Sequence, residues 1–318
     1  MALPPAVQHI STHILDQLSK SAVRPLLVAL QGPQGSGKSF LTDLVRTHLS
    51  GPPHTLNVVV LSIDDLYLTH DGLVSLSQRF PNNPLWRGRG QPGTHDVELG
   101  LKILMSLKEE RKGLELPRFD KSLFNGEGDR LPSDGTGTIV HPPVDVFIME
   151  GWFIGFYPVN LQELETKWEG IWAEERRLLD LDETVVGSKE DIIAVNEALK
   201  GYVDMWAFFD TFIKKLEAAS SPGSSISSLS MIYKWRLEQE QYMKARNGGK
   251  GMSDAAVKLF VDRYIPGYVF FADGIFKGYI VPSDGKTMSR TAAYPQWLGR
   301  SLRVYIDERR NVVGVENF

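Results

Sequence analysis

The residues with the clearest chemical pattern lie at positions 32–39 and read GPQGSGKS. They match G-x-x-x-x-G-K-[ST], the P-loop pattern that binds the phosphates of a nucleotide. The glycines let backbone N–H groups point toward an anion, and a helix starting there adds the positive end of its dipole. Lys38 would reach the β- and γ-phosphates, and the Ser39 hydroxyl would bind Mg²⁺. We therefore expect ATP and Mg²⁺ as cofactors, with nucleotide contacts from Gly32, Pro33, Gln34, Gly35, Ser36, Gly37, Lys38, Ser39 and Phe40.

Acidic residues follow two other apolar runs. The β-branched run at 58–63 ends in Asp64 and Asp65, and the run at 144–152 contains Glu150, which is the Walker B pattern. Ligands of parallel sheets bind beyond the carboxyl ends of the strands, so these carboxylates are expected on the P-loop side. They could bind the Mg²⁺ shell or accept a proton, although polar residues at a strand end also serve as plain helix caps.

Two loops between these runs are rich in charge and glycine and have no helical or strand periodicity. Loops of such length often carry function, and paired arginines can bind a carboxylate or phosphate in a bidentate manner. The alternative is a solvated basic loop without a ligand. The residues of interest in the two loops, at 79–96 and 116–130, are Arg87, Arg89, His95, Asp96, Asp120 and Arg130.

The segments around these residues indicate an α/β protein. An apolar run precedes the P-loop and an amphipathic pattern follows it, so strand, glycine loop and helix occur in the order that the motif requires. A stretch rich in Ser, Gly and Pro at 220–230 is expected to be a loop. The expected helices are 6–21, 40–49, 97–110, 161–180, 192–213, 231–246 and 254–264, and the expected strands are 26–30, 58–63, 144–152 and 302–306.

Composition narrows the class of protein. The 318 residues carry a net charge of −4, which argues against general nucleic-acid binding because that usually needs a basic surface. No cysteine is present, so disulfides, thiolate metal sites and a cysteine nucleophile are excluded. The sequence has no signal-peptide pattern and no apolar run as long as a membrane span. We expect a cytoplasmic protein without membrane attachment, and the sequence leaves nuclear entry open.

A P-loop also occurs in proteins that are not kinases. A GTP-dependent switch is disfavoured because no Asn-Lys-x-Asp segment is present to recognise guanine. An ATP-binding or ATPase module without acceptor chemistry stays an alternative, and it would be indifferent to small hydroxy acids and sugars.

Taken together, the motifs resemble P-loop kinases of the uridine kinase, phosphoribulokinase and pantothenate kinase superfamily. Within that superfamily the chain is similar to the D-glycerate 3-kinase branch, which includes fungal ATP-dependent kinases. The resemblance spreads over most of the chain. Besides the P-loop it rests on SIDDLYLT at 62–69, RGRG at 87–90, GTHD at 93–96, FDKS at 119–122, GEGDR at 126–130, EGW at 150–152 and FVDRYIP at 260–266.

The resemblance implies a single kinase domain over residues 1–318. Its fold would be the three-layer α/β/α fold of P-loop NTPases, with a mainly parallel central sheet. Acceptor-site loops would lie at about 80–135. The helices at 231–246 and 254–264, joined by glycines and carrying arginines, are expected to form a helical lid at about 231–266; the alternative is a solvated charged face. The implied reaction is transfer of the ATP γ-phosphoryl group to a hydroxyl of a small hydroxy acid, D-glycerate. Pantothenate, a nucleoside or another hydroxy acid are the alternative acceptors.

The same resemblance assigns roles to individual residues. Lys38, Asp64 and Arg130 would be catalytic, with Asp64 as the base that accepts the proton of the acceptor hydroxyl. Ser39, Asp64 and Glu150 would bind Mg²⁺. The expected acceptor-binding residues are Asp65, Tyr67, Arg87, Arg89, His95, Asp96 and Asp120.

Overall fold

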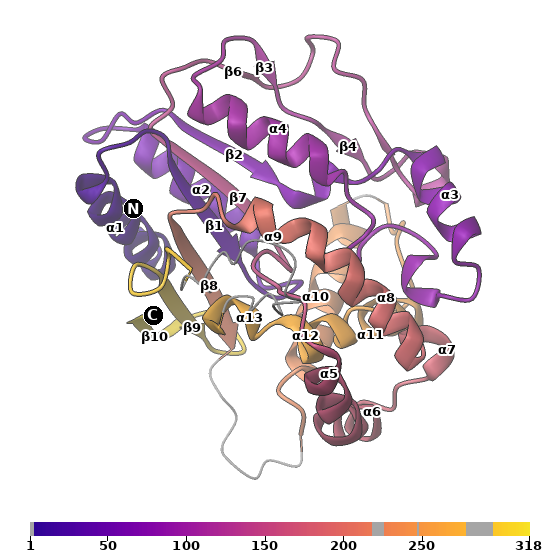
Figure 1. Cartoon of the computed structure of the whole chain (residues 1–318). Helices are drawn as coiled ribbons and strands as arrows, with labels where there is room; N and C mark the ends of the chain where they lie inside the picture. The colour runs from indigo at the N-terminus through magenta and orange to yellow at the C-terminus, as the bar shows by residue number, and fades with distance from the viewer. Residues whose placement is uncertain (1–2, 218–225, 247, 278–294) are drawn as a thin grey trace, which may run out of the picture.

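The computed structural model describes residues 3–217, 226–246, 248–277 and 295–318 (Figure 1). A six-stranded sheet has the order β10-β9-β8-β1-β7-β2. All neighbouring strands are parallel except β9 and β10, so the sheet is mainly parallel as the sequence predicts. The strands are β1 (Leu26–Gln31), β2 (Val58–Ser62), β7 (Val146–Gly151), β8 (Thr211–Glu217), β9 (Leu302–Ile306) and β10 (Val312–Asn317).

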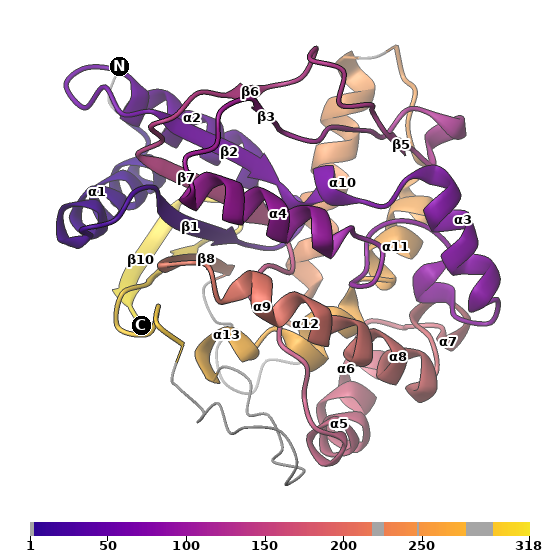
Figure 2. The ribbon, with the colours of Figure 1, turned by 45° about the horizontal axis from the view of Figure 1, so that its top comes forward.

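Helices cover the sheet on both faces because its central strands are apolar on both faces. On β1, Val28 and Leu30 belong to one apolar cluster, and Leu27 and Ala29 belong to the other, as the alternation of a strand requires. The first cluster includes side chains of α1 (Pro5–Lys20) and α2 (Lys38–Ser50). The second includes α4 (Val97–Lys108), α8 (Lys189–Leu199), α9 (Val203–Trp206) and α12 (Ile265–Phe271) (Figure 2). The three-layer α/β/α fold is confirmed.

The other elements surround the carboxyl ends of the parallel strands or extend the helical layers. Two small antiparallel pairs, β3 with β6 and β4 with β5, lie in the segment between α4 and β7. These elements are α3 (His70–Arg79), β3 (Leu114–Glu115), β4 (Phe119–Asp120), β5 (Asp129–Arg130), β6 (Ile139–Val140), α5 (Leu161–Lys167), α6 (Ala173–Leu178), α7 (Glu183–Val186), α10 (Ser230–Arg246), α11 (Asp254–Asp262) and α13 (Gly274–Lys277).

The helix predicted at 192–213 is wrong at its carboxyl end. The helical part stops at Trp206, and the chain then enters β8, which pairs in parallel with β1. Phe209 and Phe212 are fully buried, as expected for core residues. A short buried apolar run does not distinguish a helix from a strand by periodicity, which explains the error. Most of the loop predicted at 220–230 lies outside the described residues.

Strand register brings the predicted site residues to one edge of the sheet. On β7, Glu150 stands opposite Leu30 of β1 and Ser62 of β2. The P-loop follows β1 and Asp64 follows β2, so all three segments end at the same edge. This is the edge at which open parallel sheets bind ligands.

Candidate active site

The P-loop connects β1 to α2 and is followed immediately by the first helical residue, Lys38. The ammonium of Lys38 donates to the carbonyl of Pro33 at 3.0 Å, and the Ser39 hydroxyl donates to Glu150 Oε1 at 2.8 Å. Desolvation lowers the pKa of Lys38, while the carboxylates of Glu150 and Asp64 act in the opposite direction. A cation, a hydroxyl and two carboxylates therefore meet beside the loop.

Asp64 lies in a 3₁₀ turn (Ile63–Leu66) directly after β2, and its backbone N–H donates to Ser62 Oγ. Its Oδ2 accepts from Lys121 Nζ at 2.5 Å, and its Oδ1 accepts from the Tyr67 hydroxyl at 3.1 Å. Burial by itself disfavours the charge, but the nearby cation and these hydrogen bonds hold the pKa of Asp64 below its usual value. Asp64 is thus ionised and is held in position by two hydrogen bonds.

Asp65, its neighbour, has a different environment. Its Oδ1 accepts from the backbone N–H of Phe119 at 3.1 Å, which attaches β4 to the end of β2. Burial, with a smaller contribution from the Asp64 charge, raises the pKa of Asp65 to about 6. The pKa values of these two adjacent carboxyl groups are therefore shifted in opposite directions, and only the carboxylate of Asp64 is in contact with a cation.

The β4–β5 pair and its connecting loop, residues 119–130, carry Lys121 to Asp64. Asp120 accepts from the N–H and hydroxyl of Ser122 and so stays within its own loop. Arg130 donates to Asp96 Oδ2 at 2.8 Å, and the other oxygen of Asp96 caps α4 through the N–H of Leu99. The Asp96–Arg130 ion pair fixes this segment to α4.

The two arginines of the loop before α4 have different surroundings. Arg89 NH1 donates to the carbonyls of Gly126 and Glu127, and its guanidinium lies 5.6 Å from the centre of the Phe119 ring. The carbonyl of Arg89 accepts from Arg263 NH2 at 3.0 Å. Arg87 is exposed, and within the described part of the chain its guanidinium has no hydrogen bond or ion pair. Arg89 is held beside Lys121, whereas Arg87 faces solvent.

His95 is buried among aromatic rings next to Asp64. Its ring centre lies 4.4 Å from that of Tyr67, and its Nδ1 is 3.1 Å from the hydroxyl of Tyr202. The N–H of Gly93 donates to the same hydroxyl of Tyr202 at 2.9 Å. Burial lowers the pKa of His95 to about 3, so the imidazole is neutral. It supports the ring of Tyr67, whose hydroxyl donates to Asp64.

Comparison with known proteins agrees with this geometry. No family model matches the chain. The chain is 38% identical over 256 residues to a probable ATP-dependent kinase, TDA10, of Saccharomyces cerevisiae, and the match covers 78% of each protein. It is 30% identical over 295 residues to the chloroplastic D-glycerate 3-kinase of Arabidopsis thaliana, covering 92% of this chain and 54% of that protein. A solved D-glycerate 3-kinase from Cryptococcus neoformans superposes with a TM-score of 0.82 at 35% identity, over 98% of this chain and 99% of that chain.

The chain belongs to the D-glycerate 3-kinase-like family of P-loop kinases. As a member of this family it is an ATP-dependent phosphotransferase with a hydroxyl group as acceptor. The family resemblance inferred from the sequence motifs is therefore confirmed.

In this kinase the predicted site residues form two groups and leave two outliers. Lys38, Ser39, Asp64 and Glu150 gather at the P-loop edge, and their assigned roles stay predictions. Arg87 and Phe40 are the outliers, since both are exposed, Phe40 to 72% on the outside of α2. The group around β4 and β5 contains Asp65, Tyr67, Arg89, His95, Asp96, Asp120 and Arg130.

Sequence reasoning gave no role to three cations near the kinase site. Lys121 belongs to the FDKS motif, directly after Asp120, and its ammonium donates to Asp64. Lys215 lies in β8, a strand that the sequence did not predict, and its ammonium donates to the carbonyl of Ser36. Arg310 follows β9 by four residues and donates to the carbonyl of Gly35 at 2.9 Å.

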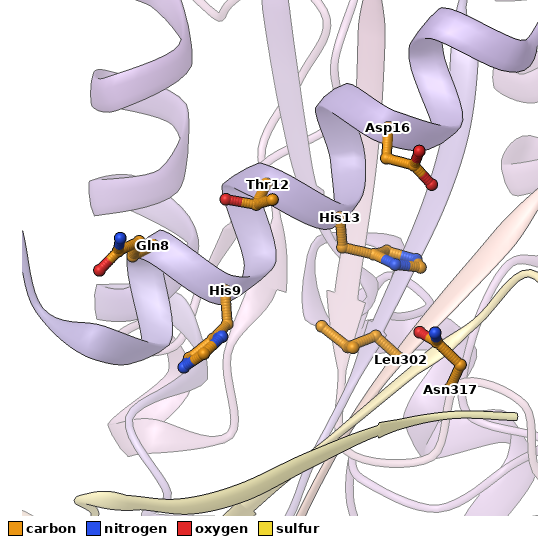
Figure 3. A pocket seen from close by; sticks show the side chains of 7 residues that line it. All are labelled: Gln8, His9, Thr12, His13, Asp16, Leu302 and Asn317. Atoms are coloured by element: carbon orange, nitrogen blue, oxygen red, sulfur yellow. The ribbon is translucent and has the colours of Figure 1, made fainter.

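A cleft of about 370 Å³ lies between α1 and the strands β9 and β10 (Figure 3). Leu302 begins β9, so this cleft lies at the amino ends of the parallel strands, at the edge opposite the P-loop. It is separate from the kinase site. Within the ranges that the structure describes, no helix combines the length and apolarity of a membrane span.

Proposed function

We propose that the chain transfers the γ-phosphoryl group of ATP to a hydroxyl of D-glycerate. The observation that carries the proposal is that Asp64 has two cations near it. It interacts electrostatically with Lys38 of the P-loop and is ion-paired with Lys121. A base near a phosphate-binding lysine and a second cation suits an acceptor that has both a hydroxyl and a negative charge.

In this proposal Asp64 orients the acceptor hydroxyl and accepts its proton during transfer. Lys38 stabilises the charge that spreads over the transferring phosphoryl group. Arg89 and Lys121 bind the carboxylate of the acceptor. Because NH1 of Arg89 is already held by two carbonyls, its remaining donors are oriented in advance for a bidentate contact. This supports Arg89 over Arg87 as the residue that binds the carboxylate.

The residues at the P-loop edge fit Mg²⁺. The Ser39 hydroxyl and the carboxylates of Glu150 and Asp64 offer the hard oxygen ligands that Mg²⁺ prefers. Among the described residues no three acidic or histidine side chains gather as a metal cage, which suits an ion held also by phosphates and water. When bound, Mg²⁺ would neutralise part of the charge of the phosphates.

The same proposal includes the organisation of the chain. It has a single kinase domain over 1–318, acceptor-site loops at 80–135 and a helical lid at 231–266. Trp235, near the start of α10, is fully buried and donates to the carbonyl of Glu308. Arg263, directly after α11, donates to the carbonyl of Arg89. Closure would therefore move the middle of this region, around the glycines at 248–251, more than its ends. We also propose a cytoplasmic location, as the sequence predicts.

A panel of acceptors tests the proposed function. ADP release would be measured with D-glycerate, L-glycerate, glycerol, pantothenate and uridine, each at saturating MgATP, and the product would be identified by phosphorus NMR. D-glycerate should give the highest kcat/KM, and glycerol, which lacks the carboxylate, should be at least about a hundredfold poorer. If pantothenate or uridine gave the highest kcat/KM, that compound and not D-glycerate would be the acceptor. ADP release that no acceptor stimulates would instead indicate an ATPase module.

A further inference from the structure

Two cations contact the P-loop from the side of the β8–β9–β10 end of the sheet. Lys215 Nζ donates to the carbonyl of Ser36, and Arg310 Nε donates to the carbonyl of Gly35 at 2.9 Å. Lys215 is only 4% exposed and lies one residue beyond the part of β8 that pairs with β1. Arg310 belongs to the turn between β9 and β10, where its φ is +66°. Neighbouring carbonyls of the loop are therefore held by two residues distant in sequence.

The orientation of these carbonyls matters for phosphate binding. In a peptide unit the C=O and the following N–H point in opposite directions. The N–H of Ser36 donates to the carbonyl of Pro33 at 3.3 Å, within the loop. The cation that holds the carbonyl of Ser36 thus directs the next N–H, that of Gly37, to the opposite side. Inward N–H groups are what a P-loop presents to an anion.

The charges add to this effect. Burial, together with the nearby cations Lys38 and Arg310, lowers the pKa of Lys215 to about 8. Lys38, Lys215 and Arg310 therefore act on one another as like charges around one loop. A polyphosphate bound in the loop would relieve that repulsion and favour the charged form of all three groups.

Arg310 also connects the loop to α10. Its NH1 donates to Glu238 Oε2 at 2.8 Å and its NH2 to the carbonyl of Trp235 at 3.4 Å. A Cβ on Gly35 would lie 2.5 Å from the backbone carbon of Trp235, so the loop and α10 are in direct contact there. The guanidinium of Arg310 thus fills the corner between the P-loop, α10 and the last hairpin.

We propose that Lys215 and Arg310 are positioning residues for the nucleotide phosphates. They hold the P-loop carbonyls outward and supply positive charge behind the loop. The carboxyl-terminal hairpin is therefore part of the ATP site, although no sequence motif marks it. This inference rests on the kinase activity but not on the identity of the acceptor.

The chain offers a close control for each residue. Lys214 is the neighbour of Lys215 on β8, is also 4% exposed, and donates to a backbone carbonyl at 2.9 Å, but that carbonyl belongs to Ala272, outside the P-loop. Burial lowers the pKa of Lys214 to about 8 as well. Arg309 is the exposed residue before Arg310 in the same turn.

The experiment measures MgADP binding by titration calorimetry, without any acceptor. Lys215→Met and Arg310→Met should each raise the Kd about tenfold, because each removes a charge-assisted hydrogen bond to the loop. Arg310→Lys should recover part of the loss by restoring the charge. Lys214→Met and Arg309→Met should change the Kd by less than about twofold. In steady-state assays the KM for ATP should rise and the KM for the acceptor should stay constant.

Three outcomes would overturn the inference. They are an unchanged Kd in Lys215→Met and Arg310→Met, an equal rise in Lys214→Met and Lys215→Met, or a parallel rise in both KM values. The second and third would indicate general loosening of the fold, and thermal unfolding of all five variants would reveal it directly. Since MgADP binding needs no acceptor, failure of D-glycerate as substrate leaves this test unaffected.

Discussion

Lys121 and Asp64 form an ion pair at 2.5 Å between the loop of the β4–β5 pair and the end of β2. The pair connects the two halves of the proposed reaction. Lys121 holds the pKa of Asp64 down in the free protein, and in the proposed reaction it also binds the carboxylate of the acceptor. An acceptor carboxylate that draws Lys121 away would raise the proton affinity of Asp64 at the moment when a base is needed.

Removal of the Lys121 charge should change the pH dependence of the reaction. In Lys121→Met, Asp64 stays buried but loses its cation, so its pKa should rise. In the normal protein the lowered pKa of Asp64 keeps the acid limb of the kcat/KM profile at low pH. In Lys121→Met this acid limb should move to higher pH. Lys112→Met, at an exposed lysine, is the control and should leave the pH profile unchanged. An acid limb that does not shift in Lys121→Met would contradict the ion pair between Lys121 and Asp64.

Replacement of Asp64 tests its role as base. Asp64→Asn keeps the size and a hydrogen-bond acceptor for Tyr67 but cannot take up a proton. We expect kcat to fall by about 10²- to 10⁴-fold, while the Kd for ADP measured without Mg²⁺ changes by less than about threefold. Single-turnover measurement of phosphoryl transfer would separate chemistry from product release. Turnover at the normal rate would exclude Asp64 as the base.

The fold and the donor half of the site were predictable because their signals are local. Residues 32–39 fix a strand, a tight loop and a helix start within a few positions, and Asp64 and Glu150 follow apolar runs directly. Side-chain partners across the chain were not predictable. The ion pair between Lys121 and Asp64 depends on how the 119–130 segment folds back onto β2.

The contacts of Lys215 and Arg310 with the P-loop illustrate the same limit at longer range. Lys215 reaches the P-loop only because β8 joins the sheet beside β1, and a short apolar run could not reveal β8 as a strand. Arg310 reaches it only because β9 and β10 extend the sheet beyond β8. Pattern and spacing identify elements, whereas register and sheet order decide which side chains meet.

The two arginines of the acceptor loop should respond differently to replacement by lysine. Lysine cannot form the planar fork of Arg89, whose NH1 is held by the carbonyls of Gly126 and Glu127. Arg89→Lys should raise the KM for D-glycerate about tenfold or more with little effect on the KM for ATP. Arg87→Lys should leave both KM values within about twofold, since Arg87 is exposed and unpaired among the described residues. The reverse order of effects in steady-state kinetics would assign the carboxylate to Arg87.

Asp65 should make the stability of the protein depend on pH. Its pKa is about 6 in the folded protein and about 3.9 when unfolded, so between these values the folded state binds more protons. Its contribution to stability therefore decreases as pH rises from about 4 to about 6, and stays constant above about pH 7. Asp65→Asn keeps the acceptor for the N–H of Phe119 and removes the titration. The free energy of urea unfolding of the variant, relative to the normal protein, should rise by on the order of 1–2 kcal/mol across this window. A difference independent of pH would contradict the raised pKa.

Gly35 and Gly37 form a matched pair that tests the contact between the P-loop and α10. Both have left-handed φ values, +70° and +81°, so alanine costs about 1 kcal/mol of backbone strain at either position. At Gly37 a Cβ would meet nothing within 4 Å, whereas at Gly35 it would lie 2.5 Å from the backbone of Trp235. Trp235 is fully buried and cannot move without disturbing the core. Gly35→Ala should therefore lower the thermal unfolding temperature and raise the Kd for MgADP more than Gly37→Ala does. Equal effects of the two substitutions would mean that α10 yields to the loop and that the contact does not constrain phosphate binding.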